Sequence, residues 1–347
     1  ITSRMKNSPN IPVKSSEGIV RLTKHSGGNL EVPLVEHLIN TYTEGSICVL
    51  TDTNAQALRV LGLLTQKGKH AQLIQSNDGF DLYNIMEIRF FLKKLGSADE
   101  NPIVDEETWK TARSNLQNKY RNSKCLTLCE NILNTFELSN YKKYRSDLDI
   151  FLRESRIEDF YLEDQNNILV STIHKSKGKE FDKVYMLLDR VTADTDEQKR
   201  KIYVGLTRAK NELYIHYNNN IFDSIKLEGI ETHLDSTIYE DAEKMIIQLN
   251  YKDVYLDYFK DKKSTILNLC SGQELSIAGN RMYISVPSGL SPILQFSQKF
   301  CNDLVRFRQS GYIPYKGEIR FILAWKQKDA EQEYAVILPD IYLKRYC

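Results

Sequence analysis

The stretch SICVLTDTNAQALRVLGLL (residues 46–64) decides the fold class of this protein. Its first five residues form an apolar run with the length of a short buried strand. After Asn54 the apolar positions 57, 60, 61 and 64 recur at helical spacing, and a second strand and helix are predicted over 71–76 and 85–95. Strand and helix alternate in this order, so the sequence predicts an α/β layer with a mostly parallel sheet.

Farther along the chain, the α/β pattern is interrupted and then resumes. Residues 97–166 show no alternation typical of strands and predict several helices. Strands are then predicted over 168–173, 181–188 and 212–217, with a helix over 197–210 between the last two. The α/β region therefore carries a helical insertion.

The last third of the chain has a different character. Residues 221–262 are predicted to be a helical connector with an apolar stripe. Residues 263–347 predict a small β-rich C-terminal domain, with one helix near 296–309 and a hairpin of 319–325 and 334–338. The predicted fold class is therefore α/β, a parallel-sheet domain with a helical insertion, followed by a small β-rich domain.

The composition is that of an ordinary globular protein. Of the 347 residues, 41% are hydrophobic and 27% are charged, and at roughly 150 residues per domain this length predicts two or three domains. The net charge of +1 neither demands nor excludes nucleic acid as a partner. No apolar run approaches the ~18 residues that cross a bilayer, so no membrane contact is expected. The first residue is not Met, and we expect the chain to be part of a longer protein.

The six cysteines form no C-x-x-C pair. In a chain of this length they do not resemble a disulfide framework, so we expect reduced thiols and a cytoplasmic location. Cys125 and Cys129 lie one helical turn apart, but no His or Cys pair follows at zinc spacing. They are predicted to be buried helix residues, and no metal site is expected.

Charge is segregated within the helical insertion. Residues 108–145 carry a net charge of +6, and residues 146–164 carry a net charge of −5. One interpretation is that two solvated helix faces attract each other. The other is a basic patch that faces phosphates. Its interleaved aromatic residues would be Trp109, Tyr120, Tyr141 and Tyr144.

The sequence contains no complete nucleotide cradle. A phosphate-binding P-loop needs the pattern GxxxxGK[ST], because backbone amides wrap the phosphates while a lysine and a hydroxyl follow. The only Gly-Lys pairs, at 68–69 and 178–179, lack both the earlier glycine and the following hydroxyl. The strained serine turn of an α/β-hydrolase is also missing from the sequence.

The loop in STIHKSKGKEF (171–181) follows a buried strand, where open α/β sheets place their ligands. Thr172 and His174 can donate to a nucleic-acid backbone. Gly178 lets the chain pass close to a ligand, and the carboxylate of Glu180 can accept from a sugar hydroxyl. Each residue alone also fits an ordinary loop, since single histidines and Lys-Gly pairs are common in turns.

A second informative stretch is QKRKIYVGLTRAK (198–210). It places the permanently charged guanidinium of Arg208 on a helix beside a sheet edge, an arrangement suited to a phosphoryl group in transfer. An exposed arginine on an amphipathic helix is the alternative interpretation.

The segments TIHKSKGKEF and YVGLTRA resemble motifs V and VI of the superfamily 1 helicases of the UvrD/Rep/PcrA type. Their order and the strand between them agree with the family pattern, and SICVLTDTNAQA is similar to the family's strand followed by Arg-Thr-Asn. The resemblance covers roughly residues 1–218 and implies a second RecA-like motor domain with an inserted helical subdomain. The implied division is 1–96 and 167–220 for the RecA-like motor domain, 97–166 for the inserted subdomain, 221–262 for the connector and 263–347 for the β-rich domain.

The resemblance implies roles on the nucleotide side of the site. Arg208 would be the catalytic residue, an arginine finger that reaches the γ-phosphate. Glu180, with Gly178 at close approach, would contact the nucleotide ribose. ATP and Mg²⁺ would be the cofactors, bound mainly by a first motor domain that this chain does not contain.

The resemblance also implies DNA contacts. Thr172 and His174 would face single-stranded DNA. Lys177 would support their loop, and Asn54 would be a weaker contact. The partners would be single-stranded or partly duplex DNA and the N-terminal helicase half. Asp52 stands where the family pattern has arginine, which predicts a weakened DNA or interdomain contact at this position.

The predicted function is the C-terminal part of an ATP-dependent DNA helicase or translocase, with DNA repair as its expected setting. The chain alone is predicted to be inactive, because it lacks a P-loop. The alternatives are a non-catalytic helicase-like scaffold that binds DNA or protein, and a subunit of a helicase–nuclease. Residues 221–347 contain no motif that assigns them a role.

Overall fold

The computed structural model describes residues 18–41, 45–74, 80–97, 102–161, 168–225, 229–326 and 332–346. The chain divides into two compact units. The first unit comprises Ile1–Ser76 and Asp164–Met245, and the second comprises Asn77–Glu163 and Ile246–Cys347. Among the described residues, no helix has the length and apolar composition needed to cross a membrane.

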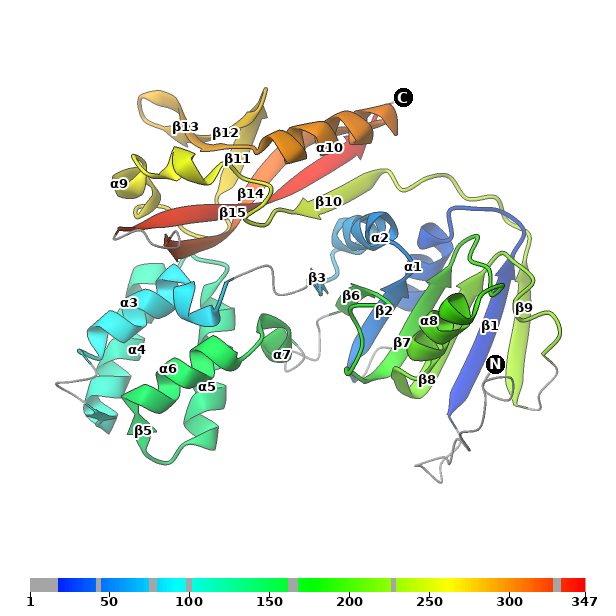
Figure 1. The fold of residues 1–347 in the computed structure, drawn as a ribbon, viewed down its shortest axis with the longest axis horizontal. Helices are drawn as coiled ribbons and strands as arrows, with labels where there is room; N and C mark the ends of the chain where they lie inside the picture. Colours follow the sequence, from blue (N-terminus) through cyan, green and yellow to red (C-terminus); the bar gives the residue numbers. More distant parts are fainter. Residues whose placement is uncertain are drawn as a thin grey trace. The chain divides into compact units, whose positions relative to one another are not determined.

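A parallel sheet of seven described strands forms the centre of the first unit, in the order β3-β6-β2-β7-β8-β1-β9 (Figure 1). Every neighbouring pair of these strands runs parallel. All residues of β2 and β6 are buried, as expected where a parallel sheet is covered on both faces. The strands are β1 (Ile19–His25), β2 (Ile47–Thr51), β3 (Ala71–Leu73), β6 (Ile168–Thr172), β7 (Phe181–Leu188), β8 (Ala209–Tyr217) and β9 (Ile230–Asp235).

Helices cover both faces of this sheet. Helices α1 (Glu31–Asn40) and α2 (Asn54–Gln66) lie on one face, and α8 (Asp196–Leu206) lies on the other (Figure 1). This follows from right-handed crossovers, because the β1–β2 and β2–β3 connections run one way across the sheet and the β7–β8 connection runs the other way. Capping boxes at Thr53 and Thr195 fix where α2 and α8 begin.

The helical insertion and the β-rich domain lie together in the second unit. Trp109 is central to the helical core, with its ring centroid 5.0 Å from that of Phe91 and 5.9 Å from that of Phe136. The Lys124 amide joins the two parts by donating to the carbonyl of Ser271 (3.1 Å). The elements of the helical part are α3 (Met86–Lys94), α4 (Glu106–Tyr120), α5 (Leu126–Ser139), α6 (Arg145–Glu154), α7 (Ile157–Tyr161), a 3₁₀ turn over Leu82–Asn84, and the short strands β4 (Ile103–Val104) and β5 (Lys143–Tyr144).

The β-rich part is built on a six-stranded sheet in the order β10-β15-β14-β11-β12-β13. Its hairpin neighbours β14 and β15 are antiparallel, as are β11–β12, β12–β13 and β11–β14. The elements are β10 (Lys244–Gln248), a 3₁₀ turn over Leu256–Phe259, α9 (Lys263–Ile266), β11 (Glu274–Ala278), β12 (Arg281–Val286), β13 (Gly289–Gln295), α10 (Gln298–Gln309), β14 (Tyr312–Lys326) and β15 (Glu333–Arg345).

The fold class predicted from the sequence is confirmed: the chain has a parallel-sheet α/β domain, a helical insertion and a β-rich C-terminal part. The predicted strand 181–188 is β7, and the segments predicted as a hairpin lie inside β14 and β15. The helix predicted over 197–210 ends at Leu206, because β8 begins at Ala209. Of the strand predicted over 71–76, β3 covers the first three residues, and the rest lies largely outside the described residues.

The prediction of a helical connector over 221–262 is wrong. The described residues of this segment contain two strands. β9 pairs with β1, and β10 belongs to the six-stranded sheet beside β15. Two residues of the apolar stripe that suggested a helix are buried, whereas Tyr255 is exposed. Val254 forms a β-bridge with Phe296, and Phe259 is fully buried. Pairing with distant strands overrides a local helical spacing.

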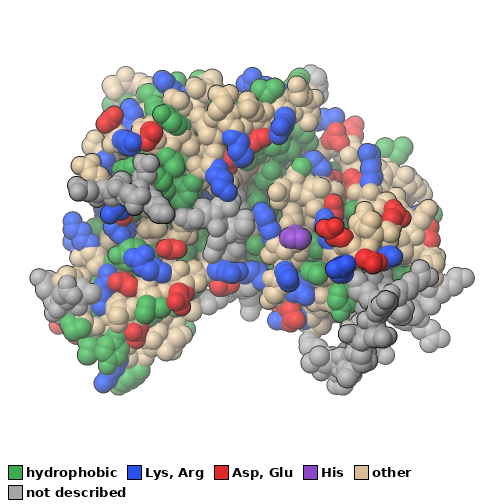
Figure 2. All heavy atoms as spheres, viewed as in Figure 1, with side chains coloured by type: hydrophobic (Ala, Val, Ile, Leu, Met, Phe, Trp, Pro, Cys, Tyr) green, Lys and Arg blue, Asp and Glu red, His purple; other side chains and the backbone are tan. Residues whose placement is uncertain are grey.

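Ion pairs within the described helical part neutralise much of the basic stretch. Arg113 pairs with both Glu130 and Glu137, which belong to the same stretch. Arg145 pairs with Asp149 and so reaches into the acidic stretch. Figure 2 shows basic and acidic side chains interspersed on the visible face of this part. Attraction between two separate helix faces therefore explains little of the described pairing.

The aromatic residues of the basic stretch divide into two pairs. Trp109 and Tyr120 are buried, at 1% and 8% exposure, and belong to the core. Tyr141 and Tyr144 are exposed. The interpretation of a patch with four interleaved aromatic residues is therefore wrong for the first two.

Cys125 directly precedes α5, and Cys129 lies within this helix. Their sulfur atoms are 3.9 Å apart. Both are buried free thiols, as predicted. A hydrogen bond that Cys125 donates to Cys129 and burial raise the pKa of Cys125, and burial raises that of Cys129. These thiols are therefore poor nucleophiles.

Candidate nucleotide and nucleic-acid site

The β6–β7 loop (residues 173–180) begins as a tight turn at the carboxyl end of β6. The Ile173 amide donates to the carbonyl of Thr51 (2.9 Å), so the pairing with β2 continues into the loop. The Ser176 amide donates to the carbonyl of Thr172 (3.2 Å), and its buried hydroxyl donates to the carbonyl of Ile173 (2.8 Å). The first half of the loop is thus held by its own hydrogen bonds.

The same loop crosses the sheet from its carboxyl edge to its amino edge. Along β2, Thr172 is in register with Thr51, whereas Lys183 near the start of β7 is in register with Ile47. Along the strand direction, Phe181 therefore lies about six residues nearer the amino edge than Thr172. At about 3.3 Å per residue this separation is roughly 20 Å. The two ends of the loop belong to opposite edges of the sheet.

Three of the predicted DNA contacts lie at the carboxyl edge. Thr172 ends β6, His174 follows it, and Asn54 begins α2 directly after β2. His174 and Asn54 are exposed, but Thr172 is only 8% exposed and offers little of its side chain to a partner. Lys177 is exposed farther along the loop. Their roles in binding DNA stay predictions.

Gly178 adopts a positive φ of 84°, which side chains other than glycine rarely adopt. No described atom lies within 4 Å of the position that a Cβ would take. The local reason for glycine is therefore the backbone conformation of the turn, and the space beside it is open.

Arg208 follows the last turn of α8 at the amino edge. Its guanidinium donates three hydrogen bonds: Nε to the carbonyl of Val204 (2.9 Å), Nη1 to the carbonyl of Lys179 (3.0 Å) and Nη2 to the hydroxyl of Thr207 (3.0 Å). The side chain is half-buried, and among the described residues it forms no ion pair. These contacts hold the guanidinium against the far end of the β6–β7 loop.

Glu180 lies between two points where the loop is attached to Arg208. The carbonyl of Lys179 accepts from the guanidinium, and the Phe181 amide donates to the Arg208 carbonyl (2.9 Å). Glu180 itself is exposed. The structure thus brings Arg208, Glu180 and Gly178 to one edge of the sheet and places Thr172 with His174 at the other.

Asp52 has a partner that the sequence analysis missed. Lys201 Nζ on α8 lies 2.5 Å from its carboxylate and 3.3 Å from its carbonyl oxygen. The acidic residue at this position of the pattern therefore ties the end of β2 to α8. The sequence shows a basic residue, Lys201, within the second motif stretch. It does not show that Asp52, which is distant in the sequence, is its partner.

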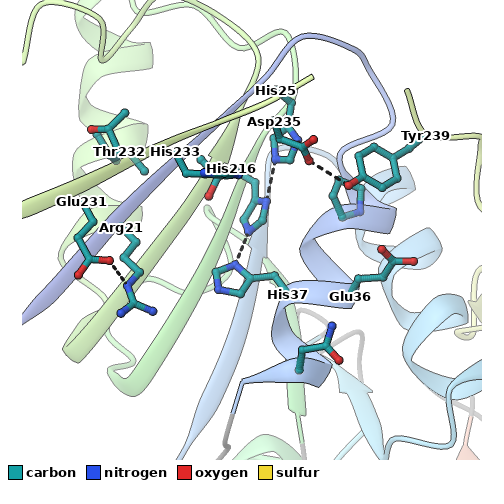
Figure 3. A pocket seen from close by; sticks show the side chains of 14 residues that line it. Arg21, His25, Glu36, His37, His216, Glu231, Thr232, His233, Asp235 and Tyr239 are labelled. Atoms are coloured by element: carbon teal, nitrogen blue, oxygen red, sulfur yellow. Dashed lines mark hydrogen bonds and ion pairs between the residues drawn. The ribbon is translucent and has the colours of Figure 1, made fainter. Parts of the chain in front are cut away.

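A second cluster lies at the carboxyl ends of β1, β8 and β9, in a cavity of about 550 Å³ beside α1 (Figure 3). His25 Nε2 is 2.9 Å from His216 Nδ1, and His216 Nε2 is 3.0 Å from His37 Nδ1. Asp235 lies 3.1 Å from His25 Nδ1 and accepts from the hydroxyl of Tyr239 (2.9 Å). Sequence reasoning did not find this chain, because its members are scattered over most of the first unit.

The histidine chain is satisfied when its members are neutral. A neutral imidazole has one donor and one acceptor nitrogen, so each ring can donate to the next acceptor in one direction. Burial lowers the pKa of His25, His37 and His216, and neighbouring histidines lower that of His216 further. Among the described residues, no group of three side chains is placed to hold a metal ion. The chain is therefore a buried network of neutral rings.

The fold and the two loop ends define the class: an α/β domain with an arginine beside the amino edge of its parallel sheet. Residues 101–220 match the model of the UvrD-like helicase C-terminal domain. The chain is 26% identical over 184 residues to the ATP-dependent DNA helicase Rep of Buchnera aphidicola subsp. Acyrthosiphon pisum (strain APS). That alignment covers 43% of this chain and 28% of Rep, so the chain spans about 28% of the length of this curated relative. The expected resemblance to the C-terminal part of a UvrD/Rep-type superfamily 1 helicase is confirmed.

Proposed function

We propose that this chain supplies the C-terminal motor part of an ATP-dependent DNA helicase or translocase. The observation that carries the proposal is the attachment of Arg208 beside Glu180, at one end of the loop whose other end carries Thr172 and His174. One loop then links a nucleotide-facing pair to a DNA-facing pair. The match to the UvrD-like helicase C-terminal domain and the likeness to Rep support this assignment.

Arg208 is the residue to which we assign the catalytic role. Its three hydrogen bonds leave two of the five N–H groups of the guanidinium for the oxygens of a γ-phosphoryl group. The positive charge would stabilise the negative charge of the phosphoryl group during transfer. Two main-chain carbonyls already hold the side chain, so it has little conformational freedom left to lose on binding.

The remaining predicted residues fall into two groups, one at each edge of the parallel sheet. The exposed carboxylate of Glu180 can accept from ribose hydroxyls, and the open space beside Gly178 leaves room for a nucleotide. At the other edge, His174 and Asn54 offer donors to a DNA strand, with Lys177 as a further cation on the loop. A change at one loop end reaches the other through this single segment.

The residues of this chain fit one side of an ATP site. ATP, when bound, supplies the phosphoryl group and the free energy of its hydrolysis. A guanidinium and a carboxylate are present, whereas the sequence has no P-loop and the described residues have no group of three metal ligands. We therefore assign the phosphate cradle and Mg²⁺ to a first motor domain and assign no step to a metal in this chain.

Phosphate release measured with and without single-stranded DNA tests the proposal. The complete protein should hydrolyse ATP and do so faster with DNA, whereas this chain alone should show no turnover, because the phosphate cradle is missing. DNA-stimulated turnover by this chain alone would contradict the assignment of the cradle to another domain.

The same assay, with a DNA-binding measurement, distinguishes the motor from the non-catalytic scaffold. If the complete protein binds a labelled oligonucleotide but hydrolyses no ATP under any condition, the non-catalytic scaffold is correct and the motor proposal is wrong.

A further inference from the structure

An ion pair ties helix α8 to the carboxyl edge of the parallel sheet. Lys201 Nζ lies 2.5 Å from a carboxylate oxygen of Asp52 and 3.3 Å from the main-chain carbonyl oxygen of the same residue. Asp52 directly follows the last residue of β2. Because one of the two contacts is to the main chain, the ammonium group is attached to the end of the strand and not to a side chain alone.

The far end of α8 is tied to the amino edge. Arg208 donates from its guanidinium to the carbonyl of Lys179 (3.0 Å) and accepts at its own carbonyl from the Phe181 amide (2.9 Å). Lys201 and Arg208 are seven positions apart, which is about two helical turns, so the two contacts lie on one side of α8. Polar contacts therefore attach α8 to the sheet at two points, one toward each edge.

Apolar packing holds α8 against the sheet in a different way. Ile202 is fully buried, and a Cβ at Gly205 would lie 2.6 Å from the terminal methyl of Met186 on β7. Such contacts are non-directional, and the methionine side chain adapts to its neighbours. They fix how close the helix lies to the sheet, whereas the directional contacts of Lys201 and Arg208 fix its position along its own axis.

Asp52 also belongs to the turn that carries a predicted DNA contact. Its amide donates to Oε1 of Gln56 (3.2 Å), in the first turn of α2, and the Thr53 amide donates to the same oxygen (3.0 Å). Asn54, the first residue of α2, lies in this turn. A DNA strand that displaced the turn would therefore move Asp52, and Lys201 with it.

We propose that Lys201 is a positioning residue that couples DNA binding at the carboxyl edge to the catalytic charge of Arg208. A shift of the turn at Asp52 is passed to α8 through the ion pair, and the helix carries the shift to Arg208. A misplacement of about 1 Å at a catalytic group can change a rate by about 100-fold, so a small movement suffices. The inference rests on the proposed function, in which DNA and ATP are the ligands of the two edges.

The pair of Asp52 and Lys201 is not part of the helicase pattern. That pattern has arginine where Asp52 stands, and an arginine there would repel Lys201. The β6–β7 loop already joins the two edges of the sheet. The ion pair therefore gives this chain a second link between them.

ATP hydrolysis by the complete protein, measured with and without single-stranded DNA, tests the proposal. Lys201→Met keeps the length and the apolar part of the side chain and removes the ammonium group. It should lower the DNA-stimulated kcat by about threefold, the scale expected for one partly exposed ion pair. The rate without DNA, KM for ATP and Kd for DNA should change less. An unchanged ratio of stimulated to unstimulated kcat would overturn the proposal.

Lys199→Met is the matched control. Lys199 lies on the same helix, and its ion pair with Asp196 (3.8 Å) joins two residues of α8. The variant removes the same charge without removing a contact between α8 and β2, so the stimulation ratio should stay unaltered. Equal losses for Lys199→Met and Lys201→Met would contradict a specific role of Lys201.

Two further variants separate positioning from a general loss of stability. Lys201→Arg keeps the positive charge and should restore most of the stimulation. In a protein that already carries Arg208→Ala, the change Lys201→Met should lower the remaining rate no further, because Lys201 acts through Arg208. A further loss of about threefold in that background would refute the positioning role.

Failure of this inference is distinguishable from failure of the proposed function. A complete protein that hydrolyses no ATP refutes both. DNA-stimulated hydrolysis that is lost with Arg208→Ala but unaffected by Lys201→Met keeps the motor proposal and refutes this inference.

Discussion

Arg208 Nη1 donates to the main-chain carbonyl of Lys179 at 3.0 Å, although the two residues are 29 positions apart. The Arg208 carbonyl in turn accepts from the Phe181 amide. The end of α8 and the end of the β6–β7 loop are therefore attached at two points. The guanidinium is held by two main-chain carbonyls, of Lys179 in the loop and Val204 in α8, and by the hydroxyl of Thr207.

Replacement of Arg208 is the direct test of its assigned role. In the complete protein, Arg208→Ala should lower kcat for DNA-stimulated ATP hydrolysis by about 100-fold or more while nucleotide affinity changes less, since the charge is needed most in the transition state. Arg200→Ala removes an exposed arginine of α8, the helix that precedes Arg208, and should leave kcat nearly unchanged. An unaltered kcat for Arg208→Ala would remove the arginine-finger assignment.

The pair of Asp52 and Lys201 should show a measurable coupling. Both side chains are partly buried, at 25% and 30% exposure, so we expect a coupling energy of about 0.5–1 kcal/mol. Urea denaturation of the unaltered protein, Asp52→Ala, Lys201→Ala and the double variant gives the four free energies of unfolding for a double-mutant cycle. Additive losses would mean that the contact contributes nothing to stability.

Two helix glycines should respond differently to alanine. A Cβ at Gly62 would lie 2.6 Å from the carbonyl oxygen of Lys244 and 2.8 Å from the Cα of Met245. The backbone cannot yield easily, so overpacking of about 1–3 kcal/mol should exceed the ~1 kcal/mol gain in helix propensity. Thermal unfolding of Gly62→Ala should therefore begin at a lower temperature.

Gly205→Ala is the matched comparison. There the close atoms are the terminal methyl and sulfur of Met186, at 2.6 and 3.1 Å, which belong to a flexible side chain. The propensity gain then offsets most of the cost, and stability should change little. A larger loss for Gly205→Ala than for Gly62→Ala would contradict this account.

Acidification should destabilise the first unit through the histidine chain. Burial lowers the pKa values of His25, His37 and His216 in the folded protein. Below pH 6.5, the ordinary pKa of histidine, these residues therefore bind more protons in the unfolded chain than in the folded protein. The stability that neutral rings provide is complete above that pH. It falls as the pH drops through 6.5 toward the folded values, by about 1.4 kcal/mol per pH unit for each ring that stays neutral.

Chemical denaturation at several pH values measures this loss. The variant His216→Gln should lower the stability at neutral pH and flatten its pH dependence below 6.5. His70→Gln, at an exposed position, should leave the pH dependence unchanged. Equal slopes for the unaltered protein and His216→Gln would show that the buried chain does not cause the acid sensitivity.

Local sequence patterns predicted the elements that are stabilised locally. The strand predicted over 181–188 coincides with β7, and the helix predicted from Asn54 is α2, because an apolar run and a 3.6-residue period are visible in adjacent residues. β1 and α1 were not predicted. In β1 only Leu22 and His25 are buried, so it shows no continuous apolar run.

The site could be predicted in its residues but not in its layout. The motifs named Arg208 and Glu180, yet the bond to the Lys179 carbonyl depends on how two segments meet at a sheet edge. The same holds for the chain of His25 and His216, which are 191 positions apart. Such contacts follow from strand order, and strand order is a property of the whole sheet.

The β6–β7 loop also limits how the gene can vary in length. Eight residues span about 20 Å and cross one intervening strand, while several of them are used in turns. A deletion here would have to be taken from β6 or β7, and a slip of one position would turn buried side chains outward. Insertions and deletions in related genes should therefore avoid this segment and gather in other connections of the sheet.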